Sequence, residues 1–138
     1  MILSETAQRL LSELEEAGQE NIPALLNAVT QKMGAPSELA QVKDGLLSLV
    51  EAGYVRVAVK SNESKHWVEC GASDSAVIVG KMSTVLRYRT DGKYWADAGV
   101  TGPPFEFRLP QIVTTDEGQA VAQKIVRERG YQWWRTTK

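Results

Sequence analysis

The 138-residue sequence contains one cysteine, one histidine and no long apolar run, and each scarcity excludes a class of protein. Because Cys70 has no second cysteine to pair with, an internal disulfide is excluded, and we expect a reducing, cytoplasmic location. No segment reaches the roughly 18 apolar residues that a membrane-spanning helix requires, so we expect no membrane contact. The N-terminal residues lack the basic segment and apolar core of a secretory signal, and we expect none.

With a single cysteine and a single histidine, the sequence offers few residues for catalysis or metal binding. His66 and Cys70 lie four residues apart, and no third residue is evident that would orient them as base and nucleophile. One histidine and one cysteine do not complete a structural zinc site. Neither of the glycine-rich phosphate-binding motifs, G-x-x-x-x-G-K-S/T and G-x-G-x-x-G, occurs in the sequence. We therefore expect a protein that is not an enzyme and holds no cofactor or metal.

The net charge of −1 conceals two halves of opposite sign. Residues 1–53 carry three basic and eight acidic residues, a net charge of −5, whereas residues 54–138 carry 13 basic and nine acidic residues, a net charge of +4. Since nucleic acid is polyanionic, we expect any contact with it to involve the second half of the chain.

Apolar residues recur at helical spacing in three segments of the acidic half. Met33 belongs to the apolar stripe of the second segment. Gly45 lies inside the third segment at a cost of about 1 kcal/mol relative to alanine, which close approach of another backbone would explain. The predicted helices run from about Ser4 to Gly18, from Asn21 to Gly34, and from Pro36 or Ser37 to Gly53.

A β-hairpin is predicted directly after the third helix. Residues 54–60 alternate and are rich in β-branched side chains, which is typical of a strand. Residues 61–64 are typical of a turn, and residues 65–69 are predicted to pair back as the return strand.

The sequence from residue 70 to residue 113 gives a weaker pattern. Ser73-Asp74 fits the cap of a helix that extends to about residue 86. The apolar runs at residues 77–79 and 85–89 also fit strands, and a strand is favoured for the second run. Asp91-Gly92 is typical of a tight turn. Residues 93–96 are predicted to form a further hairpin with residues 105–109.

The C-terminal region contains a helix start and a pair of tryptophans. Thr114 and Glu117 fit a capping box, S/T-x-x-E, which predicts that a helix begins here and ends at Gly130. Trp133 and Trp134 follow this helix. Since exposing both rings would be unfavourable, we expect them either to cap the core or to lie in a dimer interface.

Residues 21–59 and 112–129 together resemble the winged helix-turn-helix transcription regulators of the MarR and PadR type. Residues 113–118 resemble the LTxxG segment that opens the helix after the wing. The resemblance to the recognition helix and first wing strand is carried by Ser37, Val42, Leu46, Leu49 and Gly53-Tyr54-Val55.

The resemblance implies an α+β fold of winged helix-turn-helix type. The β region is enlarged, because about 55 residues separate the end of the first wing strand from the LTxxG-like segment. Either the wing carries a large insertion, or the hairpin over residues 54–69 is the wing and residues 70–113 form an added sheet. We expect one domain, with a core over residues 1–69, an additional β region over residues 70–113 and a C-terminal helix over residues 114–130.

The resemblance places Ser37 and Gln41 toward a DNA groove, near the start of the third helix. Glutamine pairs with adenine, and serine bonds to bases or phosphates. Lys43 is within reach of a phosphate. The alternative is the ordinary polar face of a surface helix. Because residues 36–53 carry a net charge of −2, most phosphate neutralisation has to come from elsewhere.

Two groups of basic residues are candidates for that role. Lys60 and Lys65 flank the predicted wing tip, where they would straddle a phosphate or enter a minor groove. Arg87 and Arg89 lie two residues apart, so on a strand they share one face, with Tyr88 on the other. The alternative explanations are lysines that keep a hairpin tip soluble and a solvated sheet face.

These observations lead to two expectations for function. The first is a cytoplasmic transcription regulator that binds double-stranded DNA as a homodimer. The alternative is a protein-interaction module on the same scaffold, in which the acidic half contacts a basic protein partner and no DNA is bound.

Overall fold

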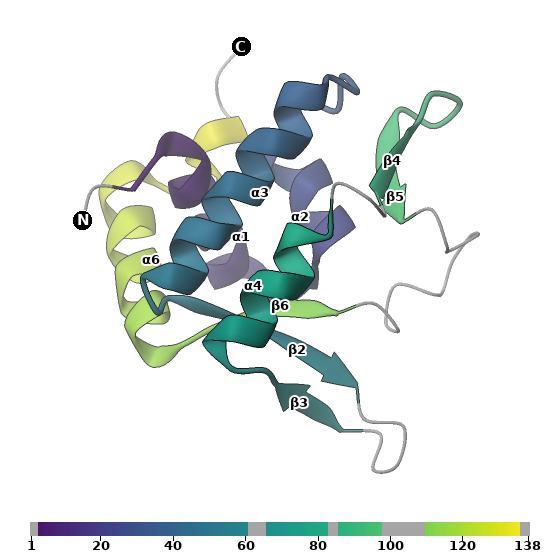
Figure 1. Cartoon of the computed structure of the whole chain (residues 1–138). Helices are drawn as coiled ribbons and strands as arrows, with labels where there is room; N and C mark the ends of the chain where they lie inside the picture. The colour runs from purple at the N-terminus through teal and green to yellow at the C-terminus, as the bar shows by residue number, and fades with distance from the viewer. Residues whose placement is uncertain (1–2, 61–65, 83–85, 98–109, 136–138) are drawn as a thin grey trace.

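The chain folds into an α+β arrangement of helices around a small antiparallel sheet (Figure 1). The computed structural model describes residues 3–60, 66–82, 86–97 and 110–135. The helices are α1 (Glu5–Ala17), α2 (Ile22–Val29), α3 (Pro36–Glu51), α4 (Ala72–Gly80), α6 (Asp116–Arg129) and the short 3₁₀ helix η2 (Trp133–Arg135). The strands are β1 (Gln19–Asn21), β2 (Val55–Lys60), β3 (Trp67–Glu69), β4 (Leu86–Arg89), β5 (Tyr94–Asp97) and β6 (Gln111–Thr114).

The last of these strands in the chain lies in the middle of the main sheet. The order is β1-β6-β2-β3, and every neighbouring pair is antiparallel. β6 pairs with β2 over four residues and with β1 over three. The predicted return strand is confirmed as β3, which pairs with residues 58–60 of β2 and forms an edge of the sheet.

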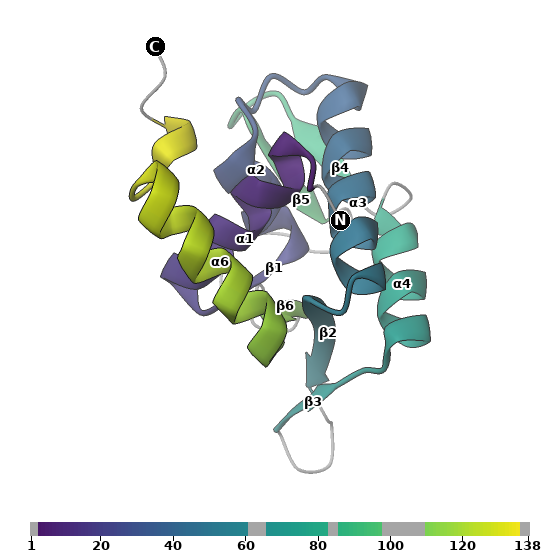
Figure 2. The ribbon, with the colours of Figure 1, turned by 90° about the vertical axis from the view of Figure 1, so that its left-hand side faces the viewer.

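The helices pack around α1 and α3. α1 packs against both α3 and α6, and α3 lies between α6 and α4 in both views (Figures 1 and 2). Gly45 allows α1 and α3 to approach closely, since a Cβ at this position would lie 3.0 Å from Leu10 Cδ1 and 3.5 Å from the Ala7 backbone nitrogen. The predicted cost of a glycine inside this helix is therefore offset by contact with α1.

The starts of the first two helices are capped as the sequence predicts. Ser4 Oγ accepts a hydrogen bond from the Ala7 N–H at 3.1 Å. Asn21 Oδ1 accepts one from the Ala24 N–H at 2.8 Å. Each cap supplies a partner for an N–H that has none inside the helix.

The predicted end of the second helix at Gly34 was wrong. α2 ends at Val29, and Met33, which the apolar stripe assigned to this helix, is 72% exposed. Thr30 Oγ1 donates to the Leu26 carbonyl at 2.7 Å, a side-chain bond at the point where the helix stops. The apolar spacing therefore continues beyond the residues that the core buries.

The region between β3 and β6 contains a helix and a separate hairpin. α4 forms where helix and strand were both possible, and it packs against α3 and β2. The predicted cap at Ser73-Asp74 was wrong, because α4 begins at Ala72 with Gly71 as its N-cap. The strand favoured over residues 85–89 is confirmed as β4. It pairs with β5 around the predicted turn at residues 91–92. The partner predicted for residues 93–96, residues 105–109, lies outside the described residues.

The start of α6 is tied to the end of α3. Thr115 rather than Thr114 caps α6: its Oγ1 accepts from the Gly118 N–H at 3.1 Å and donates to the Gly53 carbonyl at 2.6 Å. A Cβ on Gly118 would overlap the Tyr54 carbonyl oxygen, so a larger residue does not fit here. The predicted capping box was therefore wrong: contact with the α3–β2 connection makes Thr115 the N-cap, and the residue three positions later is Gly118 rather than a glutamate.

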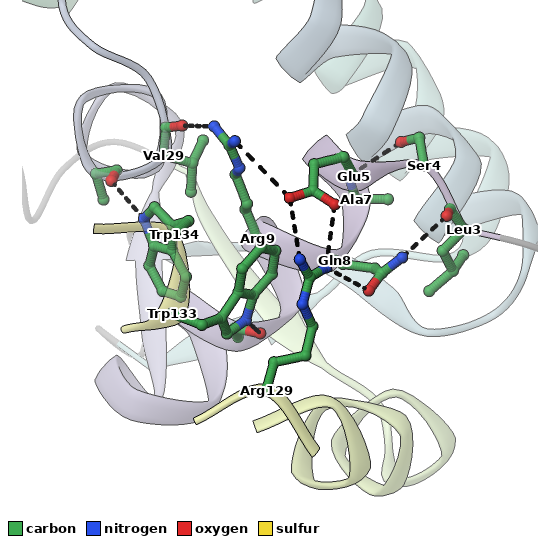
Figure 3. Close-up of polar contacts among 12 residues, drawn as sticks. Leu3, Ser4, Glu5, Ala7, Gln8, Arg9, Val29, Arg129, Trp133 and Trp134 are labelled. Carbon is green, nitrogen blue, oxygen red and sulfur yellow. Dashed lines mark hydrogen bonds and ion pairs between the residues drawn. The ribbon is translucent and has the colours of Figure 1, made fainter. Parts of the chain in front are cut away.

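Both tryptophans of the C-terminal segment are buried within one chain. Trp133 is 8% exposed and Trp134 is 9% exposed. Trp133 Nε1 donates to Ser12 Oγ, and Trp134 Nε1 donates to the Ala28 carbonyl, both at 3.0 Å (Figure 3). Of the two predicted alternatives, the structure supports a cap on the core, so no second subunit is needed to cover these rings.

Candidate nucleic-acid interface

The outward face of α3 is polar and acidic. Ser37 and Gln41 are both exposed, so these two predicted base-contacting residues are accessible. Because two carboxylates and no cation stand on this face of α3, the face alone would repel a polyanion. The exposed residues of α3 are Pro36, Ser37, Ala40, Gln41, Asp44, Ser48 and Glu51.

Lys43 does not lie on this face. Successive residues of an α-helix are rotated by about 100°, so Lys43 is displaced by about 200° from Gln41 around the axis. Its side chain is half-buried, whereas Gln41 is exposed. The structure therefore does not bring this lysine together with the exposed polar residues of α3.

The β4–β5 hairpin is fixed to the turn that precedes α3. The Tyr88 ring packs on Gly34, where an added Cβ would lie 2.6 Å from Tyr88 Cδ2. The Tyr88 hydroxyl donates to the Lys32 carbonyl at 2.6 Å. Tyr88 and Trp95 pack edge to face with 5.4 Å between ring centroids, a favourable geometry for aromatic pairs. These contacts leave no room for a side chain at Gly34, whose φ of 79° also favours glycine.

Trp95 joins the same hairpin to two helices. The Asn27 side chain of α2 donates to the Trp95 carbonyl at 2.9 Å and accepts from its N–H at 2.7 Å. The indole Nε1 of Trp95 donates to Glu38 Oε1 at 3.2 Å, in the first turn of α3. The hairpin is thus bonded to α2 and to the start of α3.

Arg87 and Arg89 are exposed on the outer face of this hairpin. Because Arg89 is paired with Tyr94 across the two strands, Tyr94 shares their face, and Tyr88 lies on the opposite face, as predicted. Tyr94 is 40% exposed. Two arginines and an accessible aromatic ring therefore occupy one side of a two-stranded ribbon, a combination that suits phosphate and base contact.

Lys32 and Lys93 extend this basic surface, which we call the hairpin patch. An acidic residue, Asp91, lies 3.8 Å from the Arg89 Nε, but the two side chains are 80% and 45% exposed. An ion pair this open to solvent contributes little to stability, so Arg89 remains able to bind another anion. The hairpin patch consists of the exposed residues Lys32, Arg87, Arg89, Lys93 and Tyr94.

The lysines of the predicted wing tip belong to a different part of the molecule. Lys60 ends β2, and its Nζ lies 5.9 Å from the Trp67 ring centroid. Lys65 lies outside the described residues. In both views the free end of the β2–β3 pair lies well away from the β4–β5 hairpin (Figures 1 and 2). Lys60 and the hairpin patch therefore do not form one surface.

Sequence reasoning missed the residues that position the hairpin. The contacts of Asn27 and Glu38 with Trp95 join residues 68 and 57 positions apart, and no local pattern signals them. Tyr94 had a usable signal, because it follows a predicted turn by two residues and so has to oppose an arginine of the first strand.

The described residues offer little for metal chemistry or a reactive thiol. Within them, no group of three or more His, Cys, Asp or Glu residues is placed to hold a metal ion. Burial raises the pKa of Cys70, and the nearby Asp74 carboxylate raises it further. A raised pKa lowers the fraction of reactive thiolate at neutral pH. In the same part of the chain, no helix combines the length and the apolar character needed to cross a membrane.

Comparison with known proteins leaves the site to be interpreted from its own geometry. No family model matches this chain, and neither the curated proteins nor the solved structures gave a similar protein.

Proposed function

We propose that this protein is a DNA-binding transcription regulator in which α3 approaches the groove and the hairpin patch contacts neighbouring phosphates. One observation carries the proposal: the hairpin that bears Arg87 and Arg89 is bonded to the turn before α3 and to its first turn. The cations are therefore held beside the helix end that exposes Ser37 and Gln41. Phosphate contacts supply the sequence-independent affinity that the acidic face of α3 lacks.

The order of the elements supports a winged helix-turn-helix scaffold for this function. The chain runs α1-β1-α2-α3-β2 and later adds β6, which lies between β1 and β2. In this proposal β2 and β6 are the wing strands, and the segment between them is an insertion that contains β3, α4, β4 and β5. The insertion supplies the basic hairpin, which a short wing would not. We extend the proposal to a homodimer, which sedimentation equilibrium tests directly.

The test is a fluorescence anisotropy titration of the full chain against pooled genomic duplexes over a salt series. We expect binding at about 50 mM salt that weakens steeply toward about 200 mM, because neutralised phosphates release counterions. Absence of binding at the lowest salt would contradict a DNA-binding role. An affinity that does not change with salt would contradict the phosphate contacts.

A second candidate function rests on the acidic face of α3. Asp44 and Glu51 are exposed there without a basic neighbour on the same face, which suits a basic protein partner. The double variant D44N/E51Q separates the two functions. If α3 approaches DNA, removing two repulsive charges strengthens DNA binding. If this face binds a basic protein, the same change weakens that complex, and the chain shows no DNA affinity to strengthen.

A further inference from the structure

A polar cavity of about 190 Å³ lies between α1, the α2–α3 turn and the first half of α3. A volume of this size holds about six waters or one small organic molecule. Most of the lining side chains are polar, and two of them are charged. The lining residues are Thr6, Arg9, Val29, Thr30, Gln31, Glu38, Gln41 and Val42.

Arg9 supplies the positive charge of this cavity, and its present partners hold it weakly. Its Nη1 donates to the Val29 carbonyl at 3.3 Å, and its Nη2 lies 3.8 Å from a Glu5 carboxylate oxygen. That carboxylate is closer to Arg129, at 3.0 and 3.4 Å (Figure 3). Arg9 Nε is buried, and no described residue accepts a hydrogen bond from it. Since Nη1 and Nη2 each carry two N–H groups, each of them retains a donor for a further acceptor.

Glu38 supplies the negative charge from the other side. The N–H groups of Met33 and Gly34 and the indole of Trp95 donate to its carboxylate at 3.1–3.2 Å. Three of these four bonds reach Oε1 and only one reaches Oε2, so Oε2 retains capacity to accept. The bonds also fix the position of the carboxylate. The cavity therefore has a cation on α1 and an immobilised anion on α3.

We propose that this cavity binds a free amino acid as a zwitterion, with its carboxylate on Arg9 and its ammonium group on Glu38. A guanidinium binds a carboxylate through two parallel hydrogen bonds, and both pairs are charge-assisted. A simple anion would be repelled by Glu38, and a simple cation would be repelled by Arg9. The amide groups of Gln31 and Gln41 favour a small or polar side chain on the ligand. Because the ligand contacts both α1 and α3, it joins the two helices.

The experiment is an NMR titration of the full-length protein, followed through its backbone amides and its arginine Nε–H groups. Glycine, serine and glutamine are added separately up to about 20 mM, with acetate and methylamine as single-charge probes. We expect saturable shifts at the cavity residues with at least one amino acid, and binding at least tenfold weaker with acetate and methylamine. Equal binding of acetate, or no saturable shift with any amino acid, overturns the proposal.

Two variants connect the binding to Arg9. R9Q is expected to weaken it at least tenfold, and R9K by a smaller factor, because an ammonium group is a point charge without the planar fork of arginine. The matched control R127Q removes an exposed arginine of α6 and is expected to bind like the parent chain. The spectrum of each variant also reports whether it is folded. Unchanged binding by folded R9Q overturns the assignment. The titration contains no DNA, so its outcome is independent of the proposed regulator function.

Discussion

The arginines of the C-terminal region and those of the hairpin patch differ in what opposes their charge. Arg129 lies 3.4 Å from the Trp133 ring centroid and donates to Glu5 and Gln8 of α1 (Figure 3). Arg87 Nη1 donates to the backbone carbonyl of the neighbouring Leu86 at 2.8 Å. The first arginine joins two helices, whereas the second keeps its charge facing solvent.

Arg135 and Arg89 repeat this difference. Arg135 pairs at 2.9 Å with Glu13, whose side chain is only 9% exposed, so the ion pair is sheltered on one side. Arg89 pairs with Asp91 at 3.8 Å, and both side chains are exposed to solvent. A sheltered charge has to be neutralised within the fold, while an exposed one is available to a partner. The comparison teaches that Arg129 and Arg135 of the second half neutralise carboxylates of the acidic half, whereas Arg87 and Arg89 of the hairpin face solvent.

Removing Trp133, on which Arg129 stacks, is expected to have the largest effect on stability. Trp133→Ala deletes a buried ring, its hydrogen bond to Ser12 and the stacking surface of Arg129. The free energy of unfolding should fall by about 3–5 kcal/mol, measured by urea denaturation. Tyr131→Ala is the control, because Tyr131 is 68% exposed and its loss should change stability by no more than about 0.5 kcal/mol. Equal effects of the two changes would show that the tail is not packed on the core.

The neighbouring carboxyl groups of Glu13 and Glu20 predict a loss of stability at alkaline pH. Burial raises the pKa of Glu20 to about 8, helped by a hydrogen bond and the charge of Glu13, while Arg135 lowers it. The pKa of Glu20 is higher in the folded chain than in the unfolded chain. The contribution of Glu20 to stability is therefore complete below about pH 4.5 and is lost as the pH rises through 8.

Urea denaturation at pH 6 and pH 9 measures this loss. We expect a fall of about 1–2 kcal/mol in the free energy of unfolding, allowing for solvent screening of a partly exposed group. Glu20→Gln cannot ionise and should flatten the dependence. A parent chain with the same slope as the variant would remove Glu20 as the cause.

Single arginine substitutions compare the two regions directly. Arg129→Gln should lower stability by about 1 kcal/mol, because it removes an ion pair and a cation–π contact at a half-exposed site. Arg87→Gln should leave stability within about 0.5 kcal/mol of the parent chain. Thermal unfolding of both variants checks this. The reverse order of effects would mean that the hairpin cations, rather than the tail cations, stabilise the fold.

A further, modest loss of stability is expected from weakening the attachment of the hairpin. Tyr88→Phe keeps the ring against Gly34 but removes the hydrogen bond to the Lys32 carbonyl, so stability should fall by about 0.5–1 kcal/mol. Hydrogen exchange of the β4 and β5 amides should quicken more than that of β2 and β6. Uniform quickening across both sheets would show that the hairpin does not open separately from the rest of the fold.

The sequence predicted the parts of the fold that local chemistry decides. The Ser4 and Asn21 caps, the strand after the third helix and the strand at residues 85–89 each have a signature within a few residues. Local patterns failed where distant contacts decide. Met33 continues a helical stripe but lies outside the helix, and Thr115 is the cap because Gly118 packs on Tyr54.

The candidate site also combines features that local sequence predicts with features that distant contacts decide. Strand periodicity alone predicts that Arg87 and Arg89 share one face, because alternation is a local property. Their position beside α3 depends on Trp95 meeting Asn27 and Glu38, which are far away in the chain and carry no motif. Lys60, the other candidate phosphate contact that the structure describes, ends β2 of the main sheet, whereas Arg87 and Arg89 lie on the separate β4–β5 sheet.

The central claim is that the hairpin patch binds duplex DNA, and two charge-matched variants test it most directly. R87Q/R89Q removes two cations from the patch, and R127Q/R129Q removes two from α6 with the same change in net charge. In salt-dependent anisotropy titrations of duplex DNA, R87Q/R89Q should lower the slope of log affinity against log salt by about 2 and weaken binding at least about tenfold. R127Q/R129Q should keep the parent slope. Equal losses in both variants, or no loss in R87Q/R89Q, would contradict the claim.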